Sequence, residues 1–421
     1  HDYLVHSLRE WVTQKQRESR RGRAELRLAE RAATWNARPE NRQLPTAWEF
    51  LTISALTARR RWTPSQAKMM SRAARVHGMR GAALLVAICL AAYAARYVDG
   101  RYHATAAVEQ LESVEVEHLD LALEHVQQYR RWAEADLRSR VAAPARTADA
   151  RRLKLHARLA LLPIDPEQIG PLRDELLNVE TSYEYAAVIR RHLHAAGPQL
   201  EGELWELLFD RSVDPIRRFH AAVALAGFAP DSERWSPEIV SFVCDQMVSI
   251  NAERQPQLRN LLRPLRTRMI DDLERIFSDA RKSEHEQTAA ASGLAEFAAD
   301  QPLRLAKLLV IASPTQYAAL HPEVAASSDL AVKEFLAKLA AEPPAESLDK
   351  PQRIELGRRR AGSAITLLRA GDKTTALEAL RSTADHEAQS QFVERSRSRG
   401  VSTADLIACV DELDQARQKL T

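Results

Sequence analysis

The feature that most constrains this sequence of 421 residues is an uncharged apolar run of fifteen residues from Gly81 to Ala95. Arg96 interrupts the run, and Tyr97 with Val98 extends it to about eighteen positions. A helix needs about 20 predominantly apolar residues to cross a bilayer, and about 17 is the lower limit. Two interpretations fit this length. One is a transmembrane helix over residues 79–98, and the other is a helix buried in the core of a soluble protein.

The charges on either side of the run favour the transmembrane interpretation. Basic residues precede the run, and acidic residues follow soon after it. They are Arg59, Arg60, Arg61, Lys68, Arg72, Arg75 and Arg80 upstream and, beyond Arg96 and Arg101, Glu109, Glu112, Glu115 and Glu117 downstream. Loops on the cytoplasmic side of a membrane carry an excess of Lys and Arg. We therefore expect a single-pass protein of the cell membrane, with its N-terminal side cytoplasmic and residues 99–421 on the other side.

The net charge of +3 is unevenly distributed along the chain. Residues 1–80 contain 17 Lys and Arg against 7 Asp and Glu, a net +10, so the remainder carries −7. A basic arm beside a membrane can bind anionic lipid, at about 1 kcal/mol for each basic residue near the surface. A nucleic acid is another polyanion that such an arm can bind. Because the apolar run follows immediately, we expect the basic juxtamembrane helices of residues 16–78 to bind membrane lipid and no nucleic acid.

Composition predicts an all-α protein. Only 13 of the 421 residues are glycine, whereas Ala, Leu, Arg and Glu, which are strong helix formers, occur in nearly every segment. In the basic arm we expect helices over Gln14–Ala33 and Thr46–Leu56. A third should begin at Pro64, with Thr63 as its N-cap, because Pro fits the first helical position.

After residue 105 the pattern is one helix after another. We expect connecting helices over 105–140, including one amphipathic helix from His118 to Leu137, and HEAT-like helical repeats over 151–341 and 352–421. Residues 141–150 and 342–351 are the expected connections between these blocks. Asp214-Pro215 predicts an N-cap and first turn, and weaker copies of this pattern begin near Glu284 and Asp385, at multiples of about 35 residues. This spacing favours an α-solenoid, with an irregular all-α domain as the alternative.

No pattern in the sequence marks a catalytic, cofactor-binding or metal-binding residue. Nucleotide-binding, kinase and zinc-protease motifs are absent from the sequence. His192 and His194 would face different sides of a helix, and the acid pairs Asp174-Glu175 and Asp271-Asp272 are expected on solvated surfaces. The cysteines at 89, 244 and 409 are too sparse for a disulfide framework or a zinc site. We expect no cofactor and no enzyme activity in this chain.

Three stretches resemble known proteins. His1-Asp2-Tyr3-Leu4-Val5, continuing through Leu8-Arg9-Glu10-Trp11, is similar to the end of the winged-helix module in STAND-type NTPases, so residues 1–15 would be the tail of that module. The region before the apolar run resembles the pre-membrane region of large planctomycete multidomain proteins. It matches at Gln16 to Ala32, Trp35-Asn36, Arg38 to Arg42, Leu44-Pro45, Trp48-Glu49, Trp62-Thr63-Pro64, Gln66, Met69-Met70, Arg75, His77-Gly78 and Arg80-Gly81. A third set echoes the repeats of the same proteins at Ala364 to Leu368, Gly371, Leu380, His386, Phe392 and Gly400 to Leu406.

Such proteins combine a serine/threonine kinase or STAND module, one membrane span, HEAT-like repeats and often a C-terminal formylglycine-generating (sulfatase-modifying factor) domain. The resemblance implies that this chain is a middle portion of a longer protein, and it carries over no catalytic residue. We therefore expect a non-catalytic, membrane-anchored connector whose helical repeats bind a protein partner. The alternative is a soluble helical-repeat adaptor in which residues 81–95 form a buried core helix.

Overall fold

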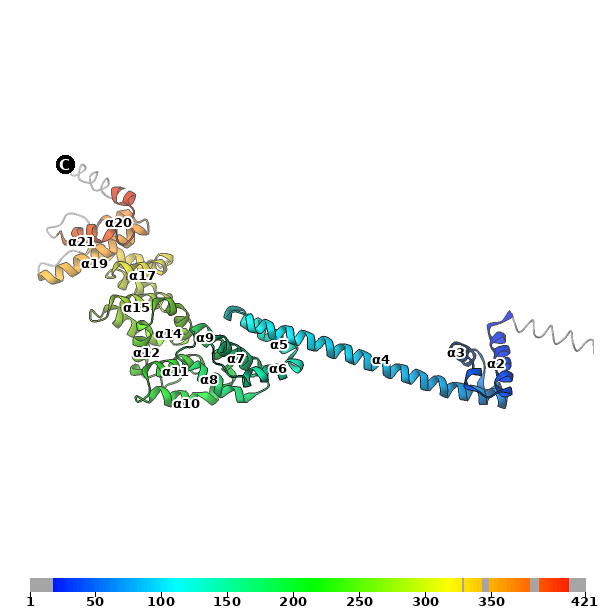
Figure 1. Ribbon diagram of the computed structural model, residues 1–421. Helices are drawn as coiled ribbons and strands as arrows, with labels where there is room; N and C mark the ends of the chain where they lie inside the picture. The colour runs from blue at the N-terminus through cyan, green and yellow to red at the C-terminus, as the bar shows by residue number, and fades with distance from the viewer. Residues whose placement is uncertain (1–17, 328, 343–347, 379–385, 409–421) are drawn as a thin grey trace, which may run out of the picture. The chain divides into compact units, whose positions relative to one another are not determined.

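The computed structural model describes residues 18–327, 329–342, 348–378 and 386–408 (Figure 1). Within these ranges the chain forms 20 α-helices and seven short 3-10 helices, with no strand. The expected all-α class is therefore confirmed. The chain divides into two compact units, residues 1–106 and 107–421. The expected winged-helix tail at 1–15 lies outside the described residues.

The first unit is built from three helices and two short 3-10 turns. They are α2 (Arg20–Ala37), η1 (Asn41–Gln43), α3 (Ala47–Leu56), η2 (Arg59–Arg61) and the first part of α4 (Pro64–Ser113). Polar side chains begin the helices at the expected places. Thr46 and Glu49 form a capping box on α3, and the Thr63 hydroxyl accepts from the Gln66 backbone N–H at 3.4 Å where α4 begins.

Helix α2 continues four residues beyond the predicted end at Ala33, to Ala37. Its end is set by Pro39, because a residue before proline avoids the helical region. Arg38 accordingly has extended backbone angles, with φ −142° and ψ 99°. The first four residues of the predicted helix, 14–17, lie outside the described part of the chain.

A small hydrophobic core joins these three helices. Leu28, Ala32 and Trp35 recur at helical spacing on α2 and bury one face of that helix. They pack in one cluster with Leu44, Ile53, Met69, Met70 and Ala73, and Phe50, Trp62 and Val76 lie at its edge. An Arg31–Glu49 ion pair of 2.9 Å also connects α2 to α3. The start of α4 is thus held in a folded unit.

The second unit is a succession of short helices (Figure 1). They are α5 (Leu119–Gln128), α6 (Arg130–Ala142), α7 (Ala148–Leu161), α8 (Ile169–Leu176), α9 (Tyr183–His192), α10 (Gly197–Phe209), α11 (Pro215–Phe228), α12 (Pro237–Ser249), α13 (Gln255–Leu262), α14 (Arg266–Ser278), α15 (Glu284–Phe297), α16 (Pro302–Leu309), α17 (Pro314–Ala326), α18 (Leu330–Ala341), α19 (Lys350–Arg369), α20 (Lys373–Glu378) and α21 (Glu387–Ser396). Short 3-10 turns lie between some of them, at η3 (Val116–His118), η4 (Pro166–Gln168), η5 (His194–Ala196), η6 (Ala252–Arg254) and η7 (Arg263–Leu265). Helices close in sequence pack on one another: α10 on α11, α14 on α15, α15 on α17, and α18 on α19.

The prediction of one helix from His118 to Leu137 was wrong. The chain forms α5 and α6 instead, separated at Tyr129, whose φ of −110° and ψ of 13° leave the helical region. Both helices pack against α7. The change of direction at Tyr129 lets Val126 of α5 and Leu137 of α6 each be buried, although a single helical stripe does not join them.

The repeat-like signals were correct where the structure describes them. Asp214 caps α11, accepting from the backbone N–H groups of Ile216 at 2.9 Å and Arg217 at 3.2 Å, and α15 begins at Glu284. Asp385 lies outside the described residues, as do 343–347 of the expected connection and 379–385 and 409–421 of the last expected block. The HEAT-like solenoid arrangement of these helices remains a prediction.

Candidate membrane anchor and surface cavities

The apolar run forms part of the 50-residue helix α4 and is exposed along its whole length. Every residue from Gly81 to Asp99 is exposed, and an 18-residue window of α4 has a mean hydropathy of 1.8 with none of it buried. The large side chains include Leu84, Ile88, Leu90 and Tyr93, each 60–64% exposed. The core-helix interpretation of residues 81–95 requires burial, which the structure does not provide.

Apolar side chains surround this part of α4 on all sides. Leu84, Leu85, Val86 and Ile88 follow one another at about 100° per residue, so they point around the whole circumference of the helix. A helix that rests on a membrane surface or on a protein keeps a polar face towards water. A helix that is apolar all round is suited to a fully apolar environment, such as the hydrocarbon core of a bilayer.

The length of the segment matches a bilayer. Residues 79–98 rise by about 30 Å at 1.5 Å per residue, which is the hydrocarbon thickness of a typical membrane. Arg80 and Arg96 lie near its two ends. Helical side chains lean towards the N-terminus, so Arg80 points out of the segment and Arg96 points back along it. Arg96 is therefore the more costly of the two in lipid.

A cavity of about 630 Å³ lies in the first unit, at the N-terminal end of the apolar segment. Its wall includes Arg42 and Arg80 together with apolar residues of η1, the loop before α3, and α4. The full lining is Asn41, Arg42, Leu44, Pro45, Thr46, Ala47, Val76, His77, Arg80, Gly81 and Leu84. A 2.8 Å hydrogen bond joins His77 Nε2 to the carbonyl of Pro45. Sequence reasoning missed this cavity, because it depends on packing the loop around residue 42 against the α4 turn around residue 80.

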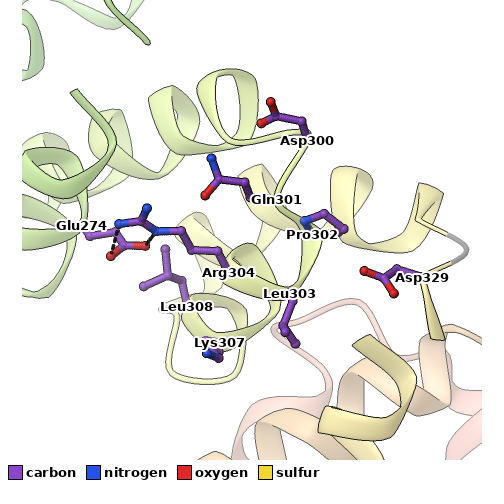
Figure 2. A pocket seen from close by; sticks show the side chains of 9 residues that line it. All are labelled: Glu274, Asp300, Gln301, Pro302, Leu303, Arg304, Lys307, Leu308 and Asp329. Atoms are coloured by element: carbon purple, nitrogen blue, oxygen red, sulfur yellow. Dashed lines mark hydrogen bonds and ion pairs between the residues drawn. The ribbon is translucent and has the colours of Figure 1, made fainter. Parts of the chain in front are cut away.

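A second cavity, of about 640 Å³, lies beside α14, α16 and the start of α18 (Figure 2). Figure 2 shows the Arg304 guanidinium facing Glu274, with Nη2 and Oε2 2.9 Å apart, and Arg304 also contacts Asp271. The hydrogen bond from Arg304 to Glu274 raises the pKa of the guanidinium, against the effect of burial. Asp300 pairs with Arg266 at 3.1 Å, and Asp329 caps α18. The carboxylates of this cavity thus have structural partners.

The residues considered from the sequence for chemistry are placed apart from one another. His192 lies 3.1 Å from Asp120 and is half-buried, which lowers its pKa first through desolvation and then through Arg191, whereas His194 is exposed. Asp174 pairs with the adjacent Arg173 at 2.8 Å. Asp271 pairs with Arg304 and Asp272 with Arg275, so the two neighbours bind different arginines.

The cysteines and the acidic side chains do not gather into a metal site in the described part of the chain. Cys89 is exposed on α4, and Cys244 is buried in α12, where burial raises the pKa of its thiol. Cys409 lies outside the described residues. Among the described residues, no group of three or more His, Cys, Asp and Glu side chains is arranged to hold a metal ion.

No protein-family model matches the chain, and neither a curated protein nor a solved structure is similar to it. The resemblance to membrane-anchored multidomain proteins therefore depends on the quoted residues alone, and the function is inferred below from the sequence and the geometry.

Proposed function

We propose that this chain is a non-catalytic, membrane-anchored connector within a larger protein. Residues 79–98 of α4 would span the membrane, the first unit would lie on the cytoplasmic surface, and the second unit would present HEAT-like repeats to a protein partner. The observation that carries the proposal is the exposed segment of α4, which is apolar on all sides and as long as a bilayer is thick.

Energetics support this reading of the segment. Contiguous exposed apolar patches larger than a few hundred Å² are rare on soluble monomers. In a bilayer, by contrast, each central Leu, Ile or Val contributes about 0.3–0.6 kcal/mol to insertion. The two arginines flank the run, where their long stems can carry the charges to the headgroups.

The first unit is suited to an anionic membrane surface. Arg59, Arg60 and Arg61 form the turn η2, and Arg42 and Arg80 line the cavity where the apolar segment begins. A basic pocket next to a membrane span has the chemistry to hold the headgroup of an anionic lipid. The same positive charges favour the cytoplasmic side for the first unit.

Membrane anchoring is tested by flotation of the full chain with vesicles of neutral lipid and of lipid containing 30% anionic headgroups. We expect the chain to float with both and to resist extraction at alkaline pH, because its anchor is apolar. Recovery from the bottom of the gradient, in buffer without detergent, would refute the anchor.

Orientation is tested separately with three substitutions, Arg59, Arg60 and Arg61 to Gln. These arginines are chosen because Arg72 donates a hydrogen bond to Asn41 and so also contributes to the first unit. We expect protease added outside intact cells, with the outer envelope permeabilised, to remove the region after Asp99 and spare the arm in the parent chain. The three Gln substitutions should yield a fraction of inverted molecules, and Lys at the same positions should not. Cleavage of the arm in the parent chain would show the opposite orientation.

The resemblance extends the proposal to the whole protein. A cytoplasmic kinase or STAND ATPase module would precede the first unit, and a formylglycine-generating-like domain would follow the second. The sequence of the complete reading frame on both sides of residues 1–421 tests this directly. Flanking regions without either kind of module would exclude the proposed parent protein and leave the anchor itself unaffected.

A further inference from the structure

A cavity of about 300 Å³ in the second unit lies between α17, the end of α19 and the turn after α21. Nothing in the sequence marked this place, because its walls come from segments about 50 and 80 residues apart. The polar side chains that line it are Tyr317, His321, Arg369, Ser398 and Arg399, and Pro314, Ala318, Pro322 and Gly400 complete the wall.

Arg399 is the unusual member of this set. Its residue is only 2% exposed, yet among the described residues no carboxylate forms an ion pair with it. Its Nη1 atom lies 3.5 Å from the carbonyl oxygen of Val310, and its Nη2 atom donates to Ala312. Its Nε atom is buried without a hydrogen-bond partner. A buried guanidinium without a counter-charge is costly, so a ligand that brings negative charge here is favoured.

A second arginine, Arg369, lies beside the first. Its Nη1 donates to the carbonyl of Arg399 at 3.1 Å. Both guanidinium groups face the ring of Tyr317, with the Cζ of Arg369 5.6 Å and that of Arg399 5.2 Å from the ring centroid. Gly400 permits this close approach, because its φ of +78° is in the left-handed region that favours glycine. The fold thus directs two positive charges towards one aromatic ring.

The surroundings add positive rather than negative charge. Arg395 and Arg358 both act on Arg399 as like charges, and burial, the larger effect, together with them lowers its pKa to about 10. His321 packs its ring 5.2 Å from that of Tyr317, and burial followed by Arg369 lowers its pKa to about 4. At neutral pH His321 is therefore uncharged, while the two arginines remain protonated.

From this geometry we propose that the cavity formed by Tyr317, His321, Arg369 and Arg399 binds a phosphate group, either as inorganic phosphate or at the end of a small phosphate ester. Guanidinium forks match phosphate oxygens, and a dianion would balance the two arginines at once. The volume is at the lower limit for small-molecule sites, so a phosphate with a short substituent fits. This inference concerns the second unit alone and does not depend on the membrane anchor.

The test uses the full chain in detergent, titrated by calorimetry with inorganic phosphate and, in a second arm, with glycerol 3-phosphate at constant ionic strength. We expect saturable one-to-one binding of at least one of them, and the tighter of the two identifies the source of the phosphate group. Acetate at the same ionic strength should bind at least tenfold more weakly, because it carries one charge.

Arg369→Gln is the test variant, and Arg397→Gln is its matched control, because Arg397 is exposed two residues from Arg399 and does not line the cavity. We expect Arg369→Gln to weaken phosphate binding at least tenfold and Arg397→Gln to leave it unchanged. Should Arg369→Gln lower stability, the imidazole of His321 in the parent chain provides an independent readout by NMR, since a phosphate beside it should raise its pKa. Absence of saturable phosphate binding, or equal weakening in both variants, would overturn the proposal.

Discussion

Replacing Ile88 with Asp distinguishes a membrane-spanning α4 from a water-exposed one. Ile88 is 60% exposed and lies at the middle of residues 79–98. In water, a substitution at such a surface position should change folding stability by no more than about 0.5 kcal/mol. In a bilayer the change removes about 0.3–0.6 kcal/mol of favourable insertion energy and adds about 2.5–3.5 kcal/mol for a carboxylate at the helix centre. The expected loss is about 3–4 kcal/mol, which corresponds to a 100- to 1,000-fold shift in partitioning.

The assay is insertion of α4 into microsomal membranes, scored by glycosylation of acceptor sites placed before and after the segment. We expect Ile88→Asp to reduce the inserted fraction strongly and Ile88→Leu to leave it unchanged. Leu121→Asp is the matched control, because Leu121 is 66% exposed and lies outside the apolar segment, on α5. If Ile88→Asp and Leu121→Asp gave the same inserted fraction, the membrane-spanning interpretation of α4 would be refuted.

Three further predictions concern the stability of the second unit, measured by urea denaturation. Gly362→Ala should destabilise it by about 1–3 kcal/mol, because a Cβ there would collide with the carbonyl oxygen of Val310 and lie 2.8 Å from its carbonyl carbon; an unchanged midpoint would show that this contact can relax. Asp214→Ala should cost about 1 kcal/mol through loss of the α11 N-cap, and Asp214→Asn should restore most of it. Trp205→Ala should cost about 3–5 kcal/mol, since this side chain is fully buried; a cost under 1 kcal/mol would contradict the packing described here.

Local signals in the sequence were sufficient for the helix content and several helix starts. Thr63-Pro64 and Asp214-Pro215 begin α4 and α11, because a side-chain cap and a proline at the first position act within one turn of the chain. The apolar run from Gly81 to Ala95 was equally readable, since its composition by itself excludes an amphipathic helix. Such features depend on neighbouring residues, so no tertiary contact is needed to recognise them.

Tertiary structure decided what depends on residues distant in sequence. The core that joins Trp35 to Met69 converts an arm that reads as solvated basic helices into a folded unit, and packing against α7 accompanies the division of the predicted helix at Tyr129. The cavity around Arg399 and Tyr317 belongs to the same class. Burial and the approach of two guanidinium groups to one ring are properties of packing between segments 80 residues apart, and no local pattern in the sequence encodes them.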